Sequence, residues 1–365
     1  MTKAAELAKM GEVLTNSQIG GRRNMVINPK FSVAQRGTSF SGFSTSEYHL
    51  DRFRNGMGDT TARFTVTQAS SGLNGFPHCL KYDCTTAEAS LANGNARMFL
   101  HTRFEGQDLQ QLKKGTSDAE KVTVSFYVKS NKTGTYILEL EDKDNTRQIS
   151  KTYTINSANT WEQKIVTFEG DTTGAFDNDN ANSCHLTWHL IAGTNYQSGT
   201  LNTSWASQTH ANRAVGNVNI GDSTDNTWEI TGIQMEIGSQ ATPFEHRSFG
   251  EELALCQRYL TKYTGVTAIK TFPHTAPLQS WNDNNASNGM LSTTVTMRTA
   301  PTITQSGLRL RSPVYGDFDG TFAFESITVD GCHVANGSNS GLNTGRIYYI
   351  SSTNTSSYIQ LDSEL

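Results

Sequence analysis

The chain has 365 residues, of which 35% are hydrophobic and 18% are charged, and its formal net charge at pH 7 is −4. Sequence-independent binding of nucleic acid needs a basic surface, and a net charge of −4 does not indicate one. No apolar run approaches the 18 residues of a membrane span, so we expect no membrane insertion. With 17 Phe, 12 Tyr, 5 Trp and only 7 Pro, the chain does not have the composition of a disordered protein.

Residues 1–23 predict a short helical arm for attachment or oligomerisation, which Gly20 and Gly21 end. Leu7, Met10 and Leu14 fit about one and a half heptads, which is too short for a coiled coil. Two interpretations stay open. The arm is either a solvated segment or a docking segment that associates with itself or a partner through these three residues.

Residues 24–249 carry a β pattern throughout. Short segments of alternating polar and apolar residues are separated by turns rich in Gly and Asn, with no helix between them. This order argues against a parallel α/β sheet and predicts an antiparallel sandwich or barrel. The expected strands include 63–67, 122–128, 135–140, 149–155, 163–168, 185–190 and 228–236.

Residues 250–263 are rich in helix formers, and we predict a helical connector there. The β pattern then returns, and residues 264–365 are long enough for one smaller β-domain. Its expected strands are 290–297, 301–310, 321–329, 346–351 and 358–361. The fold class predicted for the whole chain is therefore all-β.

Catalytic and metal-binding patterns are weak. The acidic stretches 139–142 and 177–180 offer carboxylate pairs for a glycosidase, but we interpret them as solvated turns. Residues 177–182 offer oxygen ligands for calcium, yet they lack the Gly and closing Glu of an EF-hand. His185 and His189 can face one side of a strand, with a packing role preferred over a metal site. We expect no enzyme, no cofactor, and five cysteines present as free thiols.

Aromatic residues remain as candidates for binding. Trp188 and Trp228 alternate within strands and are predicted to be core residues, whereas Trp205 and Trp281 lie in polar loops. An aromatic ring stacks on the apolar face of a sugar while neighbouring amides and carboxylates bond its hydroxyls. The ligand-binding candidates chosen on this basis are Trp281, Asn282, Asp283 and Tyr315.

Three groups of segments carry a family resemblance. The first is NMVINP at 24–29 with VAQRGTSF at 33–40 and YHLDRF at 48–53, and the second is VSFYVKS at 124–130 with NTWE at 159–162 and GDTTG at 170–174. The third and most specific is ITGIQMEIGS at 230–239, continuing as ATPFEHRS at 241–248. Over residues 4–262 the chain resembles tail-fibre or minor structural proteins of tailed bacteriophages, especially those of marine and cyanobacterial hosts.

The resemblance implies a jelly-roll body similar to carbohydrate-binding modules, and it transfers no catalytic residue. It implies a virion protein made in the host cytoplasm, with other tail, baseplate or head proteins and a host surface polysaccharide as partners. We expect a homotrimeric tail fibre or receptor-binding protein whose domain at 264–365 is the recognition tip. The alternatives are a structural adaptor or capsid-decorating protein without a ligand and, less favoured, a polysaccharide depolymerase.

Overall fold

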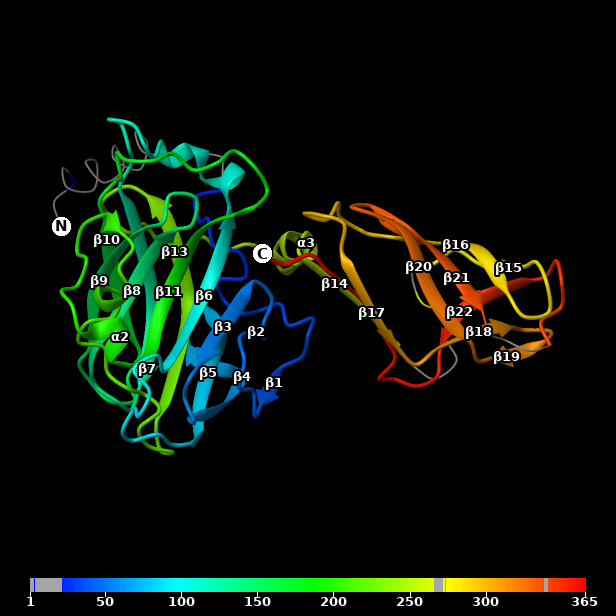
Figure 1. The fold of residues 1–365 in the computed structure, drawn as a ribbon, viewed down its shortest axis with the longest axis horizontal. Coiled ribbons are helices and arrows are strands. Elements are labelled where there is room, and N and C mark those ends of the chain that lie inside the picture. The colour runs from blue at the N-terminus through cyan, green and yellow to red at the C-terminus, as the bar shows by residue number, and fades with distance from the viewer. Residues whose placement is uncertain (1–2, 4–21, 266–271, 273, 338–340) are drawn as a thin grey trace. The chain divides into compact units, whose positions relative to one another are not determined.

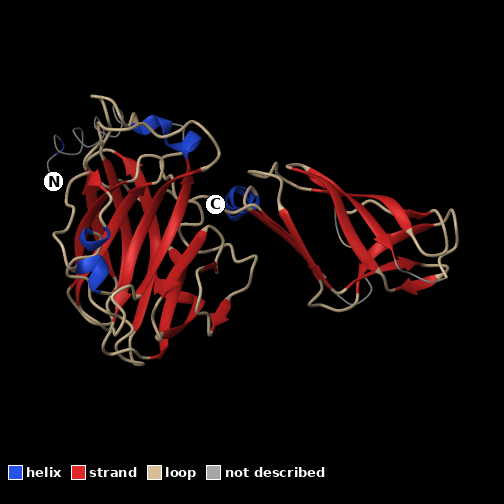
Figure 2. Ribbon diagram, viewed as in Figure 1, coloured by secondary structure: helices blue, strands red, loops and turns tan. Residues whose placement is uncertain are grey.

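The computed structural model describes residues 3, 22–265, 272, 274–337 and 341–365. The chain divides into two compact units, an N-terminal unit that ends at Phe249 and also includes Leu365, and a C-terminal unit over 250–364. The predicted docking residues Leu7, Met10 and Leu14 lie outside the described residues. Strands dominate both units, so the prediction of an all-β chain is confirmed (Figure 2).

The N-terminal unit is a jelly-roll sandwich of two antiparallel sheets (Figure 1). The first sheet has the order β1 (Ser39–Ser41), β4 (Arg63–Leu73), β5 (Phe76–Thr86), β13 (Thr227–Ile237), β7 (Val122–Ser130) and β10 (Glu162–Phe168). The second has the order β12 (Ala206–Ser207), β9 (Arg147–Ile155), β8 (Gly134–Asp142), β11 (Asn182–Ala192), β6 (Arg97–Glu105), β3 (Phe53–Gly58) and β2 (Glu47–Tyr48). Short helical turns η1 (Gly106–Leu112), α2 (Thr194–Gln197) and η2 (His210–Asn212) lie in its loops.

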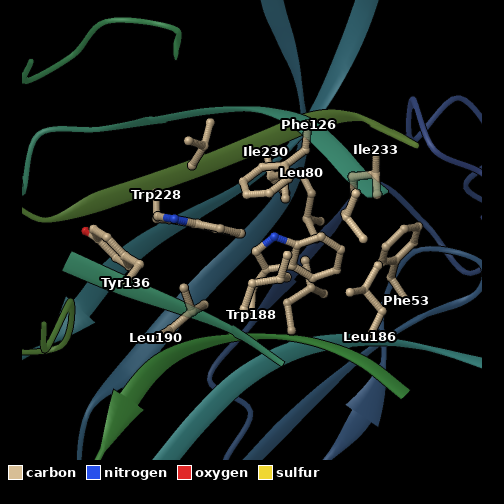
Figure 3. Packing of buried hydrophobic residues seen from close by; sticks show 14 of the residues in the cluster. Phe53, Leu80, Phe126, Tyr136, Leu186, Trp188, Leu190, Trp228, Ile230 and Ile233 are labelled. Carbon is tan, nitrogen blue, oxygen red and sulfur yellow. The ribbon is translucent and has the colours of Figure 1, made fainter. Parts of the chain in front are cut away.

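The core of the N-terminal unit lies between the two sheets, because alternate residues of each strand point inward. Trp188 of β11 and Trp228 of β13 are fully buried, as their positions within strands predicted. Trp188 packs edge-on against Phe126 with ring centroids 5.7 Å apart (Figure 3). Burying a side chain of this size contributes about 4–6 kcal/mol of hydrophobic transfer free energy.

The C-terminal unit contains two further antiparallel sheets. One has three strands in the order β14 (Leu260–Thr264), β23 (Tyr358–Asp362) and β17 (Thr302–Ser306). The other has seven in the order β19 (Gly316–Phe318), β18 (Leu308–Ser312), β22 (Ile347–Ser352), β15 (Leu278–Ser280), β16 (Ala286–Ser292), β21 (Gly331–Gly337) and β20 (Thr321–Thr328). Its core is a separate cluster that includes Leu278, Leu310, Val334, Tyr348 and Ile350.

Three boundaries differ from the sequence prediction. The strand expected over 290–297 ends at Ser292 of β16, and residues 293–297 lie outside any strand. The helix expected over 250–263 is shorter: α3 spans Phe249–Gln257, and Leu260–Thr264 forms β14 instead. Pairing with β23 buries Leu260 and Tyr263, and this tertiary gain overrides the helical pattern. The strand expected over 301–310 is broken at Gly307, whose φ of +66° favours glycine, so that β17 and β18 join different sheets.

All five cysteines are free and buried. Burial raises the pKa of the Cys79 thiol to about 12, and Glu229 beside it acts in the same direction. Burial likewise raises the pKa of Cys332 to about 11. Their thiolates are therefore scarce near neutral pH, and these side chains behave as small apolar core residues.

Candidate functional site

The outer face of the seven-stranded sheet in the N-terminal unit carries a charged cluster that is largely buried. Glu139 and Glu141 project from β8 and pair across to Thr187 and His185 of β11. Their exposed fractions are 0% and 5%, so the expectation that residues 139–142 form a solvated turn is wrong. Strand alternation is the reason: Leu138 and Leu140 fill the core, which places the two glutamates on the opposite face.

Arg213 holds the two carboxylates together from the loop above them. It donates from Nε to Oε1 of Glu139 at 2.9 Å, and from Nη2 to Oε2 of Glu139 at 2.7 Å and to Oε2 of Glu141 at 3.0 Å. His189 Nε2 lies 3.0 Å from Oε2 of Glu139, and His185 Nδ1 lies 3.3 Å from Oε2 of Glu141. As predicted, both histidines face one side of β11, while Trp188 faces the core.

The ion pairs determine the protonation of this cluster. Burial alone would raise the pKa of Glu139, but the charge of Arg213 and the hydrogen bond from His189 outweigh it and lower that pKa. Burial would also raise the pKa of Glu141, which the hydrogen bond from His185 and the charge of Arg213 lower instead. Both carboxylates are therefore ionised at neutral pH.

A cavity of about 240 Å³ opens beside this cluster. This volume is well above the ~15 Å³ that one water needs. We call it the outer-face cleft. It is lined by Arg97 and Phe99 of β6, His189 and Ile191 of β11, Tyr196 of α2, His210 of η2, and Arg213.

Aromatic rings meet hydrogen-bonding groups in the outer-face cleft. Tyr196 and His210 pack edge-on with ring centroids 5.7 Å apart, and Phe99 lies 5.9 Å from His189. Arg97 donates from Nη1 to the Tyr196 hydroxyl at 3.3 Å and pairs with Asp59 at 3.2 Å. The cleft therefore combines apolar ring surface with fixed donors, and each guanidinium in its wall has a carboxylate partner.

Glycine makes the floor of the outer-face cleft possible. Gly56 of β3 pairs with Phe99, and a Cβ at position 56 would come within 2.1 Å of the Phe99 ring. Gly58 pairs with Arg97 in the same way, and a Cβ at position 58 would come within 2.9 Å of the Arg97 guanidinium. Both long side chains therefore lie across bare backbone of the neighbouring strand, which fixes their positions in the cleft.

A second buried cation lies elsewhere in the N-terminal unit. The ammonium of Lys114 is 2.5 Å from Oδ2 of Asp142 and 3.2 Å from Oδ2 of Asp171. It also donates to the carbonyl oxygens of Thr173 at 2.9 Å and Gly174 at 2.6 Å. Two carboxylates and two carbonyls are the oxygen set that calcium prefers, and here a lysine side chain occupies their centre.

The residues that the sequence suggested for calcium are not gathered in this way. Residues 177–180 are exposed, and the carbonyls of Asp177 and Asp179 accept hydrogen bonds from Gln110 and Gln107. No group of three or more His, Cys, Asp or Glu within the described ranges is placed to hold a metal ion. Trp205, a loop candidate for binding, is partly buried and donates to the carbonyl of Glu169 at 2.7 Å, which indicates a structural role.

The predicted ligand-binding residues lie together at one end of the C-terminal seven-stranded sheet. Trp281, Asn282 and Asp283 form the turn between β15 and β16, and Tyr315 lies in the turn between β18 and β19. Arg346 connects the two turns, because its carbonyl accepts from Ser280 N at 2.9 Å and its guanidinium lies 5.9 Å from the Tyr315 ring. Ligand binding by these residues stays a prediction.

Sequence reasoning missed the outer-face cleft. Its residues come from β6, β11 and the 194–213 loop, and only the strand order β8-β11-β6 brings them together. One signal was available in the sequence: His185 with His189 places two ionisable side chains on one face of a predicted strand. Glu139 with Glu141 gives the same signal once the strand predicted over 135–140 is extended to Asp142, where β8 ends. Two such strands side by side indicate a sheet face whose ionisable side chains pair with each other or with a covering loop.

No helix in the described ranges has both the length and the apolar character of a membrane span. No family model matches the sequence, and neither does any curated protein.

Several solved structures are similar to part of this chain. A two-module fragment of xylanase 10B from Clostridium thermocellum, described as CBM22-1–GH10 with xylohexaose, is 12% identical with a TM-score of 0.31, covering 62% of this chain and 30% of that one. The family 11 carbohydrate-binding module of the Clostridium thermocellum cellulase Lic26A-Cel5E is 12% identical with a TM-score of 0.29, covering 62% and 100%.

The enzymatically active domain of tailspike protein 4 of bacteriophage CBA120 is 10% identical with a TM-score of 0.29, covering 59% of this chain and 21% of that one. Less than a third of the xylanase and tailspike chains is therefore spanned. The assignment of a jelly-roll sandwich rests on the sheet order described above.

Proposed function

We propose that this chain binds a saccharide in the outer-face cleft. The observation that carries the proposal is the convergence of ring faces and fixed hydrogen-bond donors on a cavity of about 240 Å³. The Phe99 and Tyr196 rings offer surface for the C–H face of a sugar, while Arg97 and His210 offer donors for its hydroxyls. The charges in the wall are paired, as in Arg97–Asp59 and Arg213–Glu139, which favours a polar ligand without strong charge.

The base of the cleft is rigid before the ligand arrives. Arg213 is fixed by Glu139 and Glu141, and His189 is fixed by Glu139. Groups that are already ordered lose little conformational entropy on binding, so more of the contact energy appears as affinity.

The two glutamates beside the cleft favour binding of a saccharide over its hydrolysis. A glycosidase needs one carboxylic acid with a raised pKa to protonate the leaving group. Glu139 and Glu141 both have lowered pKa values and both are committed to Arg213. Neither is suited to donate a proton near neutral pH.

The biological setting we propose is the surface of a phage virion. Its support is the sequence resemblance, above all ITGIQMEIGS at 230–239, most of which forms β13 in the middle of the first sheet. In this role the chain is a tail fibre or receptor-binding protein, a homotrimer that contacts other virion proteins and attaches to host polysaccharide. Several weak sites in one assembly gain avidity without better individual contacts.

The test of saccharide binding is a Phe99→Ala variant of the full chain, probed on an array of bacterial O-antigen and capsular polysaccharides. We expect wild type to bind at least one polysaccharide and the variant to lose about tenfold in affinity, equal to about 1.4 kcal/mol. Ile165→Ala, which truncates a residue exposed on β10 of the other sheet, is the matched control. Equal binding by both variants would remove the cleft as the site.

The virion role is tested separately. Fluorescently labelled chain should decorate host cells, and light scattering should give three times the mass of the monomer. Tight binding to virion proteins with none to any cell envelope would favour the adaptor function instead. Release of reducing ends from a bound polysaccharide would favour the depolymerase.

A further inference from the structure

Large apolar side chains that are exposed collect at one end of the C-terminal seven-stranded sheet. β15 and β18 end there, β22 begins there, and Gly345 N donates to the carbonyl of Ser280 at 2.8 Å. We call this group the aromatic end. Its members, with their exposed fractions, are Trp281 (64%), Val314 (77%), Tyr315 (37%), Ile347 (55%) and Tyr349 (37%).

The turn that presents Trp281 is held by its own hydrogen bonds. The Asn282 side chain accepts from Asn284 N at 2.8 Å and from Asn285 N at 2.7 Å. Trp281 N donates to the carbonyl of Asn285 at 3.2 Å, and the carbonyl of Asp283 accepts from Leu342 N at 2.9 Å. Leu342 is buried in the C-terminal core, so the turn is anchored to the body of the unit. The exposed indole is therefore displayed from a fixed support.

Polar groups alternate with the apolar ones on the same face. Gln279 of β15 points outward beside Ile347 of β22, and Ser287 of β16 lies on the other side of Gln279. Neighbouring strands are about 4.8 Å apart, so a linear polymer lying across the three strands would meet these groups in succession.

Charges at the aromatic end are nearly balanced. Arg346 lies over Tyr315, and Arg311, opposite Tyr349, has its Nε 3.9 Å from Asp317. Asp283 is exposed in the Trp281 turn. A surface of this composition suits a neutral, hydroxyl-rich polymer better than a polyanion or a purely apolar partner.

We propose that the aromatic end binds along a neutral polysaccharide chain, as a second site that is independent of the outer-face cleft. Trp281 and Tyr315, backed by Arg346, form the stacking platform. The outward polar groups of β15 and β16 bond the hydroxyls. The proposal goes beyond cleft binding, because it concerns other residues, another unit and a flat surface in place of a cavity.

The experiment uses the full chain and three immobilised neutral polysaccharides: cellulose, β-1,3-glucan and a neutral bacterial O-antigen. Trp281→Ala and Tyr315→Ala should each lower retention by tenfold or more. Met290→Ala, which truncates an exposed residue on β16 outside the aromatic end, should leave it unchanged. Thermal unfolding of all three variants should match wild type, since exposed side chains contribute little to stability.

A second readout locates the contact directly. Trp281 is the only tryptophan whose ring is mostly exposed, so N-bromosuccinimide should oxidise it first, and bound polysaccharide should protect it. This protection should persist in the Phe99→Ala variant, which separates failure of this site from failure of the cleft.

Three results would overturn the proposal. One is equal retention of Trp281→Ala and Met290→Ala. Another is that none of the three polysaccharides is retained by wild type or protects Trp281. The third is a change of oligomeric state in Trp281→Ala with retention unchanged, which would make the aromatic end an interface between copies.

Discussion

The two units place their aromatic and charged side chains in opposite ways. Of the twelve largest fully buried side chains, ten lie in the N-terminal unit, including Trp188 and Trp228. Of the eight large hydrophobic residues that are exposed in the described ranges, six lie in the C-terminal unit, including Trp281. The N-terminal unit in turn buries charge, at Glu139 and Lys114 among others.

This contrast separates two ways of building a binding surface. A cavity needs walls that are fixed from behind, and the buried ion pairs of the N-terminal unit supply them. A flat platform needs only a stable turn, so a smaller core is enough to support it. Burying charge is costly unless every partner is present, and the N-terminal unit should therefore be the more vulnerable to loss of a single ionic group.

The largest effect is expected from Arg213→Met. The substitution leaves Glu139 buried without its guanidinium partner and Glu141 with Lys143 in place of two cations, and it should cost about 3–5 kcal/mol of stability. Chemical denaturation followed by tryptophan fluorescence reports on the N-terminal unit, which contains four of the five tryptophans. Lys121→Met removes the exposed pair with Glu169 and should change stability by less than about 0.5 kcal/mol. Equal losses in the two variants would contradict the contrast between the units.

Lys114→Ala should cost about 3 kcal/mol, because it leaves the buried Asp142 without its ammonium partner, while Asp171 keeps its pair with Arg147. The vacated position has four oxygen ligands, so millimolar Ca²⁺ should restore part of the stability of the variant. The measurement is the unfolding temperature with and without Ca²⁺. Wild type should not respond, and an equal gain in both proteins would show that calcium acts elsewhere.

The smallest of these effects is a dependence on pH in the N-terminal unit. Burial lowers the pKa of His101 and of His185, and His185 and Arg103 lower that of His101 further. Below about pH 6.5 the unfolded chain takes up protons that the folded chain does not, so stability falls as pH falls. The two residues together should cost about 2 kcal/mol between pH 6.5 and 5.5, at up to about 1.4 kcal/mol per residue.

Denaturation at pH 6.5 and 5.5 measures this loss, to which His49 adds because burial lowers its pKa as well. His101→Phe should reduce the loss by about 1 kcal/mol. A loss of the same size in the variant would contradict the assignment to His101. The lowered pKa values of Glu139 and Glu141 affect stability in a different, more acidic pH range. Their contribution is complete above about pH 4.5 and is lost only as pH falls further toward their folded-state values.

Much of the fold follows from local pattern. Segment 122–128 alternates because one face meets a large core, and it lies within β7. Segment 228–236 lies within β13, but its apolar residues change phase at a bulge next to Gly232. The C-terminal boundaries were harder, since Gly307 divides one apparent strand and Leu260 and Tyr263 gain more from pairing with β23 than from a helix. The local sequence pattern does not show which segments will pair, so it cannot predict the stability gained from that pairing.

The candidate sites divide in the same way. Trp281 could be selected from sequence because it stands in a polar turn, and the structure places the turns of Trp281 and Tyr315 at one end of a sheet. The outer-face cleft could not, because Phe99 and Arg213 are far apart along the chain and meet only through the sheet order.

The bare backbone at Gly56 has an evolutionary consequence. A single codon change to alanine or serine would displace the Phe99 ring and reshape the cleft, although position 56 itself does not line it. The sandwich core would be untouched, because Gly56 faces outward on β3. Substitution at this position could therefore vary the shape of the cleft in small steps, while the scaffold stays under constant selection for stability.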